Sequence, residues 1–268
     1  MDTVSTNEAD KILGTKKGPI GTLTFNYPEK LNAMSPEMSQ AAGYVIDDFA
    51  SDPAIRVVIL RGAGTKAFVS GGDISKYEGN RSTPEQIAQY NKMSSGFRTS
   101  LRGIGKPTIA MIRGWCLGGG LAISLNCDIR ICSEEAQFGI PASKLGIGYN
   151  AESLAQLIEL VGPSVAKEFL YTARRYPAYE AHRLGLVNHV CQAHMLESFV
   201  NSYADNIAGN APLSIVASKR VIDEYVKDPE KRNQKLADDA VAACFTSADY
   251  KEGRKAFMEK RKPVWQGK

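Results

Sequence analysis

Three consecutive glycines, Gly118, Gly119 and Gly120, interrupt an apolar run that then resumes with a helical pattern. Without a Cβ, these residues let a ligand oxygen approach the backbone N–H groups closely, and a helix beginning here adds the positive end of its dipole. A second glycine turn, residues 70–73, follows the β-rich run 57–61 and could supply another N–H donor. Two donors on one oxygen would stabilise an enolate, although a plain strand-to-helix turn has the same glycine signature.

The elements that must position these turns alternate along the chain. Ser35 and Pro36 have the residue types of a helix cap and first turn, and further helical patterns begin after Gly96, Gly120 and Pro163. Beyond residue 196 the pattern is continuously helical. This alternation predicts an α/β fold. The expected strands cover residues 18–25, 57–61, 108–112 and 128–132.

Composition indicates a cytoplasmic enzyme with no membrane segment. The 268 residues carry a formal charge of only +4 and contain no apolar run long enough to span a bilayer, and the first ten residues are polar rather than a signal peptide. The five cysteines lack paired spacing and indicate buried free thiols, and the three histidines fit no standard metal site. We therefore expect no metal. The residues concerned are Cys116, Cys127, Cys132, Cys191 and Cys244, with His182, His189 and His194.

Several ordered signatures extend over nearly the whole chain. They are residues 28–33, the turn from Ala67 to Asp73, Lys106-Pro107, the triple glycine, Asp128, residues 136–139, Leu145-Gly146, residues 181–188 and residues 257–260. In these signatures the chain is similar to the enoyl-CoA hydratase/isomerase family, the crotonase superfamily. The resemblance implies a crotonase-like spiral of ββα units over residues 1–195 that binds acyl-CoA and does the chemistry. It implies that residues 196–268 form a helical region that caps CoA and assembles homo-trimers or homo-hexamers.

The same resemblance assigns roles to individual residues. It implies that the N–H groups of Gly72 and Gly119 polarise the thioester carbonyl of an acyl-CoA substrate. Phe257 and Lys260 would reach the adenine and the 3′-phosphate of CoA, frequently from a neighbouring subunit. Because CoA is part of the substrate, no separate cofactor is expected. The remaining substrate contacts implied are Lys30, Leu31, Ala33, Ser70, Asp73 and Ile74.

The chain departs from the family where hydratases carry two glutamates, since the matching positions are Ala122 and Ala142. One such carboxylate deprotonates the attacking water and the other protonates the α-carbon, each step contributing ~10²- to 10⁴-fold. Alanine does neither. Isomerases of the superfamily carry an acid at the position matching Asn150, which does not ionise. A hydratase name would thus describe the family better than the chemistry.

Residues 145–150 are similar to the corresponding segment of methylmalonyl-CoA decarboxylases, with Tyr149-Asn150 as the matching pair. Decarboxylation needs no base, because loss of CO₂ generates the enolate, and a phenol can orient the departing carboxylate. Those decarboxylases have a histidine where this chain has Gly72. Tyr149 could equally be an aromatic lid that packs on the next helix. Glu152 could be a relocated base or an ordinary first-turn carboxylate.

Other functions remain open at this point. Hydration or isomerisation of an enoyl-CoA is the family default, and a non-catalytic acyl-CoA binder is compatible with the two alanines. Nucleic-acid binding is disfavoured, because residues 35–50 contain Glu37, Asp47 and Asp48 but no lysine or arginine. The acyl group is not identified by the sequence.

Overall fold

A computed structural model of the chain describes residues 3–4, 11–73 and 83–268, so Ile74 lies outside the described residues. Its main sheet has seven strands in the order β1-β2-β3-β4-β6-β8-β11. The first three pair antiparallel and the others parallel, and the four strands expected from the sequence are confirmed within two residues. The bounds are β1 Thr3–Val4, β2 Ile12–Lys17, β3 Ile20–Phe25, β4 Val57–Gly62, β6 Thr108–Ile112, β8 Ile129–Ser133 and β11 His189–Cys191.

A second sheet of four short strands, β10-β9-β7-β5, carries the glycine turns. Strands β5, β7 and β9 run parallel, so their carboxyl ends meet at one edge. Gly71-Gly72 follow β5, Gly118-Gly119 follow β7, and the segment containing Pro141 follows β9. This topology brings the separate turns together. The bounds are β5 Ala67–Val69, β7 Trp115–Leu117, β9 Gln137–Gly139 and β10 Tyr176–Pro177.

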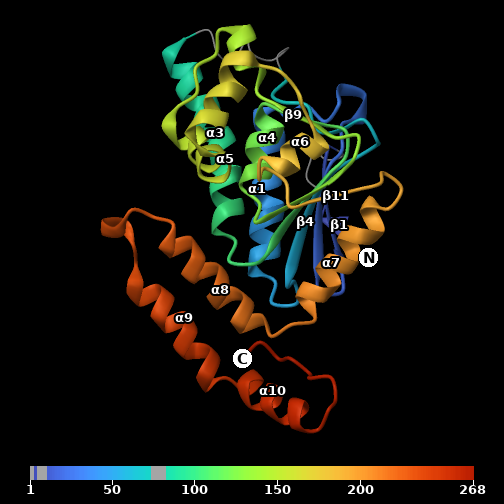
Figure 1. The fold of residues 1–268 in the computed structure, drawn as a ribbon, viewed down its shortest axis with the longest axis vertical. Helices are drawn as coiled ribbons and strands as arrows, with labels where there is room; N and C mark the ends of the chain where they lie inside the picture. Colours follow the sequence, from blue (N-terminus) through green and yellow to red (C-terminus); the bar gives the residue numbers. More distant parts are fainter. Residues whose placement is uncertain (1–2, 5–10, 74–82) are drawn as a thin grey trace.

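Helices cover both sides of the main sheet (Figure 1). On one side α1 begins as expected, with the Ser35 hydroxyl accepting a hydrogen bond from Met38 N at 3.2 Å and Pro36 in the first turn. Its apolar face, at helical spacing, is buried in the main core. The helices are α1 Pro36–Ser51, α3 Pro84–Gly103, α4 Gly119–Leu125, α5 Ala151–Thr172, α6 Ala178–Arg183, α7 Leu196–Ala208, α8 Pro212–Tyr225, α9 Gln234–Thr246 and α10 Ala248–Met258, with 3-10 turns η1 Pro28–Lys30, η3 Pro141–Leu145 and η4 Pro229–Lys231.

One helix start was predicted too late. Helix α3 begins at Pro84 behind a capping box made by Thr83 and Gln86, and Gly96 lies in its interior. A glycine costs a helix only about 1 kcal/mol, which packing of α3 along α1 can offset. Helix α5 begins at Ala151, so Glu152 lies in its first turn, and Gly162 interrupts the helix with φ +74° before Pro163 starts the second part.

Helix α7, the first of the region expected after residue 196, packs on the other face of the main sheet. Leu196, Val200 and Ala204 are buried there against Ile59 and Ile109. Helices α8, α9 and α10 instead extend away from the two sheets as an arm, and the carboxyl terminus lies beside α10 (Figure 1). The part that projects from the core therefore begins with α8.

A charged contact of Lys219 helps to join this arm to the core. Lys219 Nζ of α8 lies 2.7 Å from Asp128 Oδ2 and donates to Lys106 O at 3.1 Å. The same carboxylate accepts hydrogen bonds from Thr108 N and Thr108 Oγ1 at 2.8 and 3.0 Å. Because the Lys219 side chain is only 10% exposed, its charge is held where water compensates it poorly.

All five cysteines are free thiols; Cys116, Cys127 and Cys132 are buried as expected, whereas Cys191 and Cys244 are partly exposed. Burial raises the pKa of Cys116 and of Cys127 to about 12, so both stay protonated near neutral pH. Across the described part of the chain, no helix is both long enough and apolar enough to cross a bilayer.

We predict that Lys219→Met lowers the free energy of unfolding by ~1.5–3 kcal/mol, because it removes the hydrogen bonds of a charged ammonium that is mostly buried. Urea unfolding at fixed protein concentration measures the change. Lys235→Met is the matched control, since Lys235 forms an exposed ion pair with Asp239 on α9 and should cost only ~0.5 kcal/mol. Equal losses in the two variants would contradict the role of Lys219.

Candidate functional site

The two glycine turns lie against each other. A methyl group placed on Gly119 would lie 3.6 Å from Gly72 N and 3.6 Å from the carbonyl carbon of Gly71. Gly119 is the first residue of α4, so its N–H has no acceptor inside the helix. The sequence-predicted pair, Gly72 and Gly119, is thus brought to one place by strands β5 and β7.

A bridge to the segment after η1 sets the direction of the Gly72 N–H. Met34 N donates to Gly71 O at 2.9 Å, and Asp73 N donates to Met34 O at 2.8 Å. In a parallel bridge of this kind the flanking residues make the bonds, so the N–H of Gly72 points to the opposite side. That side faces the start of α4.

Glycine is required at two positions of the triple glycine for different reasons. Gly118 has φ +51°, a conformation that other residues rarely adopt, and its N–H donates to Gly139 O at 2.8 Å. At Gly120 a Cβ would lie 2.0 Å from Val69 O, so helix α4 packs directly on the end of β5. Gly119 itself has room for a Cβ. Steric crowding therefore does not require glycine at position 119, and the feature of interest there is the backbone N–H group.

The far end of α4 is fixed by a buried arginine. Arg130 Nη1 donates to Ser124 O and Cys127 O, and its Nε donates to Leu186 O at 2.8 Å. Burial lowers the pKa of this guanidinium, yet an arginine remains charged near neutral pH. A cation at a helix carboxyl terminus is favourable, and here it also ties α4 to the chain that follows α6.

The two alanines that the family resemblance matches to hydratase glutamates carry no ionisable group. Ala142 is 5% exposed in η3, directly after Pro141, whose ring would lie 4.0 Å from a methyl group on Gly118. Ala122 is 9% exposed in α4, one turn beyond Gly119. Methyl groups cannot transfer protons, so any proton transfer must come from other residues.

Tyr149 does approach the glycine turn. A methyl group on Gly118 would lie 4.0 Å from the Tyr149 hydroxyl, and the half-buried ring also packs on the main core. Asn150 has a structural task, because its side-chain oxygen accepts a hydrogen bond from Ser153 N at 2.9 Å and caps α5. Glu152 lies in the first turn of α5, and its side chain falls outside the described residues.

The segment expected to contact CoA borders the Gly72 turn. Leu31 O accepts a hydrogen bond from Ser70 N at 3.1 Å, and Ala33 follows in the same turn. The exposed Lys30 ammonium lies 3.9 Å from the buried carboxylate of Asp73. The structure thus gathers five of the predicted contacts, whereas Ile74 lies outside the described residues.

Sequence reasoning overlooked Asn32, which the structure places between these segments. Its side chain is fully buried and makes hydrogen bonds to Tyr27 N, Ala63 O and Ala67 O at 2.8–3.0 Å. An asparagine after a proline-containing turn is a signal for left-handed backbone, and Asn32 has φ +56°. Its long-range partners could not be read from the sequence.

Phe257 and Lys260 lie at the end of α10 and are separated from the glycine turns of the same chain by the length of the arm (Figure 1). Phe257 is 83% exposed, and several other apolar side chains of the arm are exposed as well. A single chain therefore does not bring these two residues to its own glycine turns.

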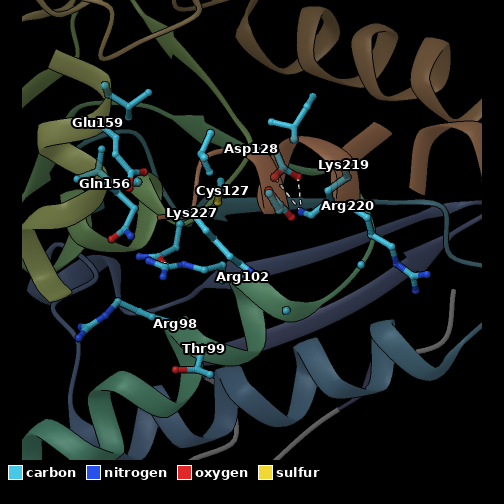
Figure 2. A pocket seen from close by; sticks show the side chains of 18 of the residues that line it. Arg98, Thr99, Arg102, Cys127, Asp128, Gln156, Glu159, Lys219, Arg220 and Lys227 are labelled. Carbon is cyan, nitrogen blue, oxygen red and sulfur yellow. Dashed lines mark hydrogen bonds and ion pairs between the residues drawn. The ribbon is translucent and has the colours of Figure 1, made fainter. Parts of the chain in front are cut away.

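A separate charged cleft of about 1100 Å³ lies where α8 meets the core. Figure 2 shows Arg98 and Arg102 of α3 on one side, with the Lys219–Asp128 pair further along the wall. Burial raises the pKa of Asp223, which also lines this space. The cleft shares α4 with the glycine turns, because Ala122 forms part of its wall.

Comparisons with known proteins agree with this architecture. The sequence model of the family described as enoyl-CoA hydratase/isomerase matches residues 15–268. A short-chain-enoyl-CoA hydratase of Clostridium acetobutylicum is 34% identical over 255 residues, which are 95% of this chain and 97% of the relative. A crotonyl-CoA hydratase of Syntrophomonas wolfei is 34% identical over 253 residues, covering 94% of this chain and 96% of the relative.

A crystal structure of an enoyl-CoA hydratase/carnithine racemase from Magnetospirillum magneticum has the same fold, with a TM-score of 0.93. It is 34% identical, and the match covers 97% of this chain and 96% of that chain. The predicted crotonase-like α/β fold is confirmed by this likeness. The chain therefore belongs to the enoyl-CoA hydratase/isomerase family, the crotonase superfamily, and is one of its enzymes.

Proposed function

We propose that the enzyme binds an acyl-CoA thioester and stabilises its enolate with the N–H groups of Gly72 and Gly119. The observation that carries this proposal is the contact of the two turns, in which a methyl group on Gly119 would lie 3.6 Å from Gly72 N. An oxygen that enters this space can meet both donors. Loss of one such donor typically slows a reaction ~10²- to 10³-fold, so the pair is a sufficient reason for catalysis.

The reaction that we favour is decarboxylation of a malonyl-type CoA. The bond between the α-carbon and the carboxylate breaks, CO₂ leaves, and the electron pair forms the enolate, whose α-carbon then takes a proton from water. This sequence needs no carboxylate pair, in keeping with Ala122 and Ala142. Its support in the site is the Tyr149 hydroxyl beside Gly118, which can orient the departing carboxylate by a hydrogen bond.

Hydration or isomerisation of an enoyl-CoA is the second candidate, favoured by the hydratase names of the two relatives. It needs an acid and a base that replace the family glutamates, and Tyr149 and Glu152 are the residues that we assign to this alternative. A non-catalytic acyl-CoA binder is the remaining possibility among proteins with this fold. The three differ in the products formed from defined CoA esters.

We further propose that CoA recognition is completed by a second subunit in a homo-trimer or homo-hexamer. The arm exposes apolar side chains that include Ile222, Tyr225 and Phe245, and exposed apolar surface of this kind is typical of a subunit interface. Phe257 and Lys260 on that arm would then reach the nucleotide of CoA held near Lys30 of a neighbour. A cytoplasmic location accords with this substrate.

The first test of the proposed reaction is a mass-spectrometric screen of methylmalonyl-CoA, crotonyl-CoA and a 3-enoyl-CoA. We expect loss of CO₂ from methylmalonyl-CoA, with Tyr149→Phe slowing it about 10- to 100-fold, the equivalent of one hydrogen bond to a charged group. Crotonyl-CoA hydration near an ordinary enzymatic rate of ~10 s⁻¹ would instead assign a hydratase. Binding without any product would assign a binder.

The enolate mechanism is tested by Gly119→Val. A Cβ fits at this position, so the variant should fold and keep its oligomeric size, while the added side chain stands in front of Gly72 N. We expect turnover of the best CoA ester to fall ~10²- to 10³-fold. Gly43→Ala on α1, where a Cβ meets nothing within 4 Å, is the control. Parental turnover by a folded Gly119→Val protein would rule out the mechanism.

For the arm, we predict that Lys260→Glu weakens binding of CoA esters by about tenfold at low ionic strength, where the attraction between an ammonium and phosphate is least screened. The loss should shrink as salt is added. Titration calorimetry at several salt concentrations measures it, with Lys235→Glu on the exposed face of α9 as control. The same affinity for Lys260→Glu and the parent at every salt concentration would remove Lys260 from the site.

A further inference from the structure

We propose that Asn32 is a positioning residue that fixes the Gly72 donor of the oxyanion hole and, with it, the segment that contacts CoA. The inference rests on the proposed function, because it assigns Asn32 a role in polarising the thioester. Asn32 is not placed to touch the substrate. It acts through the backbone that carries Gly72.

The Asn32 side chain uses both ends of its amide. Oδ1 accepts a hydrogen bond from Tyr27 N at 2.9 Å, which closes the turn around η1. Nδ2 donates to Ala63 O at 3.0 Å and to Ala67 O at 2.8 Å, at the two ends of the loop that leads into β5. One fully buried side chain therefore joins the turn 27–32 to the strand that ends at the glycines.

Main-chain bonds then carry this attachment to Gly72. Leu31 O accepts a hydrogen bond from Ser70 N. Met34 N donates to Gly71 O and Met34 O accepts from Asp73 N, so Met34 is bonded to the residues on both sides of Gly72. A displacement of Asn32 would move these partners together. The Asn32 amide packs tightly against Gly62, because a Cβ on Gly62 would lie 2.7 Å from Asn32 Nδ2 and 2.3 Å from Ala67 O. The Gly72 N–H is aimed by this packed contact.

The backbone conformation at position 32 limits which residue types can join the two segments. Leu31 and Asn32 have φ +54° and +56°, and asparagine, aspartate and glycine accept this region most readily. Glycine supplies no side-chain hydrogen bond, and an aspartate carboxylate cannot donate to Ala63 O and Ala67 O. Asparagine meets both demands.

Asn32→Asp and Asn32→Gly keep the backbone conformation accessible and remove the donated bonds, so they separate positioning from simple folding. Thr108→Val is the matched control. This variant removes a buried hydroxyl that makes hydrogen bonds with Asp128. Thr108 is the first residue of β6, so the change lies at the amino-terminal end of the parallel strands, away from the loop after β4 that Asn32 contacts. Thermal unfolding and oligomer size are compared first for all three.

The readout is the infrared carbonyl stretch of butyryl-CoA labelled with ¹³C at the thioester carbon. Hydrogen bonds to the oxygen lower this frequency, and the saturated ester undergoes none of the candidate reactions. Butyryl-pantetheine, which lacks the nucleotide, is measured in parallel at saturating concentration. If the variants lost the frequency shift with butyryl-CoA but not with butyryl-pantetheine, Asn32 would affect nucleotide binding alone, and the inference would be overturned.

For the wild-type enzyme and Thr108→Val we expect a lowered carbonyl frequency with both esters. Folded Asn32→Asp and Asn32→Gly should lose most of that shift with both, while affinity for butyryl-CoA falls by less than about tenfold. A full shift in either folded variant, or failure of both to fold beside a folded Thr108→Val, would overturn the inference. If the wild-type enzyme itself shows no shift, the proposed function fails instead.

Discussion

The close approach of α4 to the end of β5 is the constraint on which the site depends. A Cβ on Gly120 would lie only 2.0 Å from Val69 O, so this position must be glycine for the helix to start against the strand. Once α4 is seated there, Gly119 lies against Gly72, and we propose that the N–H groups of both residues face the same space. Helix α4 is only seven residues long. In this proposal, direct donation from the two N–H groups contributes more than a long helix dipole would.

Around this space the protein supplies hydrogen bonds rather than titrating carboxylates. The two positions that the family resemblance matches to hydratase glutamates, Ala122 and Ala142, hold buried methyl groups, while a phenol lies beside Gly118. Such a site holds an enolate without removing a proton from a substrate. An enolate can also form when a bond to carbon breaks, and this is the reason why we propose loss of CO₂ rather than addition of water.

Local signals in the sequence were enough to predict the parts of the fold that depend on neighbouring residues. Ser35 and Pro36 define the start of α1, the β-rich runs become strands, and the glycine turns lie where strand and helix meet. The start of α3 was misplaced because a tertiary partner compensates for Gly96. Asn32 went unnoticed because its three partners are set by the fold, two of them more than thirty residues away. For the same reason a role for Tyr149 at the site could be proposed only from family resemblance.

The central claim is that two backbone donors converge on one thioester oxygen. A crystal structure of the assembled enzyme with butyryl-CoA tests this most directly. The account predicts that the thioester oxygen lies about 2.7–3.1 Å from both Gly72 N and Gly119 N, with the acyl chain continuing past Tyr149. A thioester bound elsewhere, or one whose oxygen meets neither nitrogen, would contradict it.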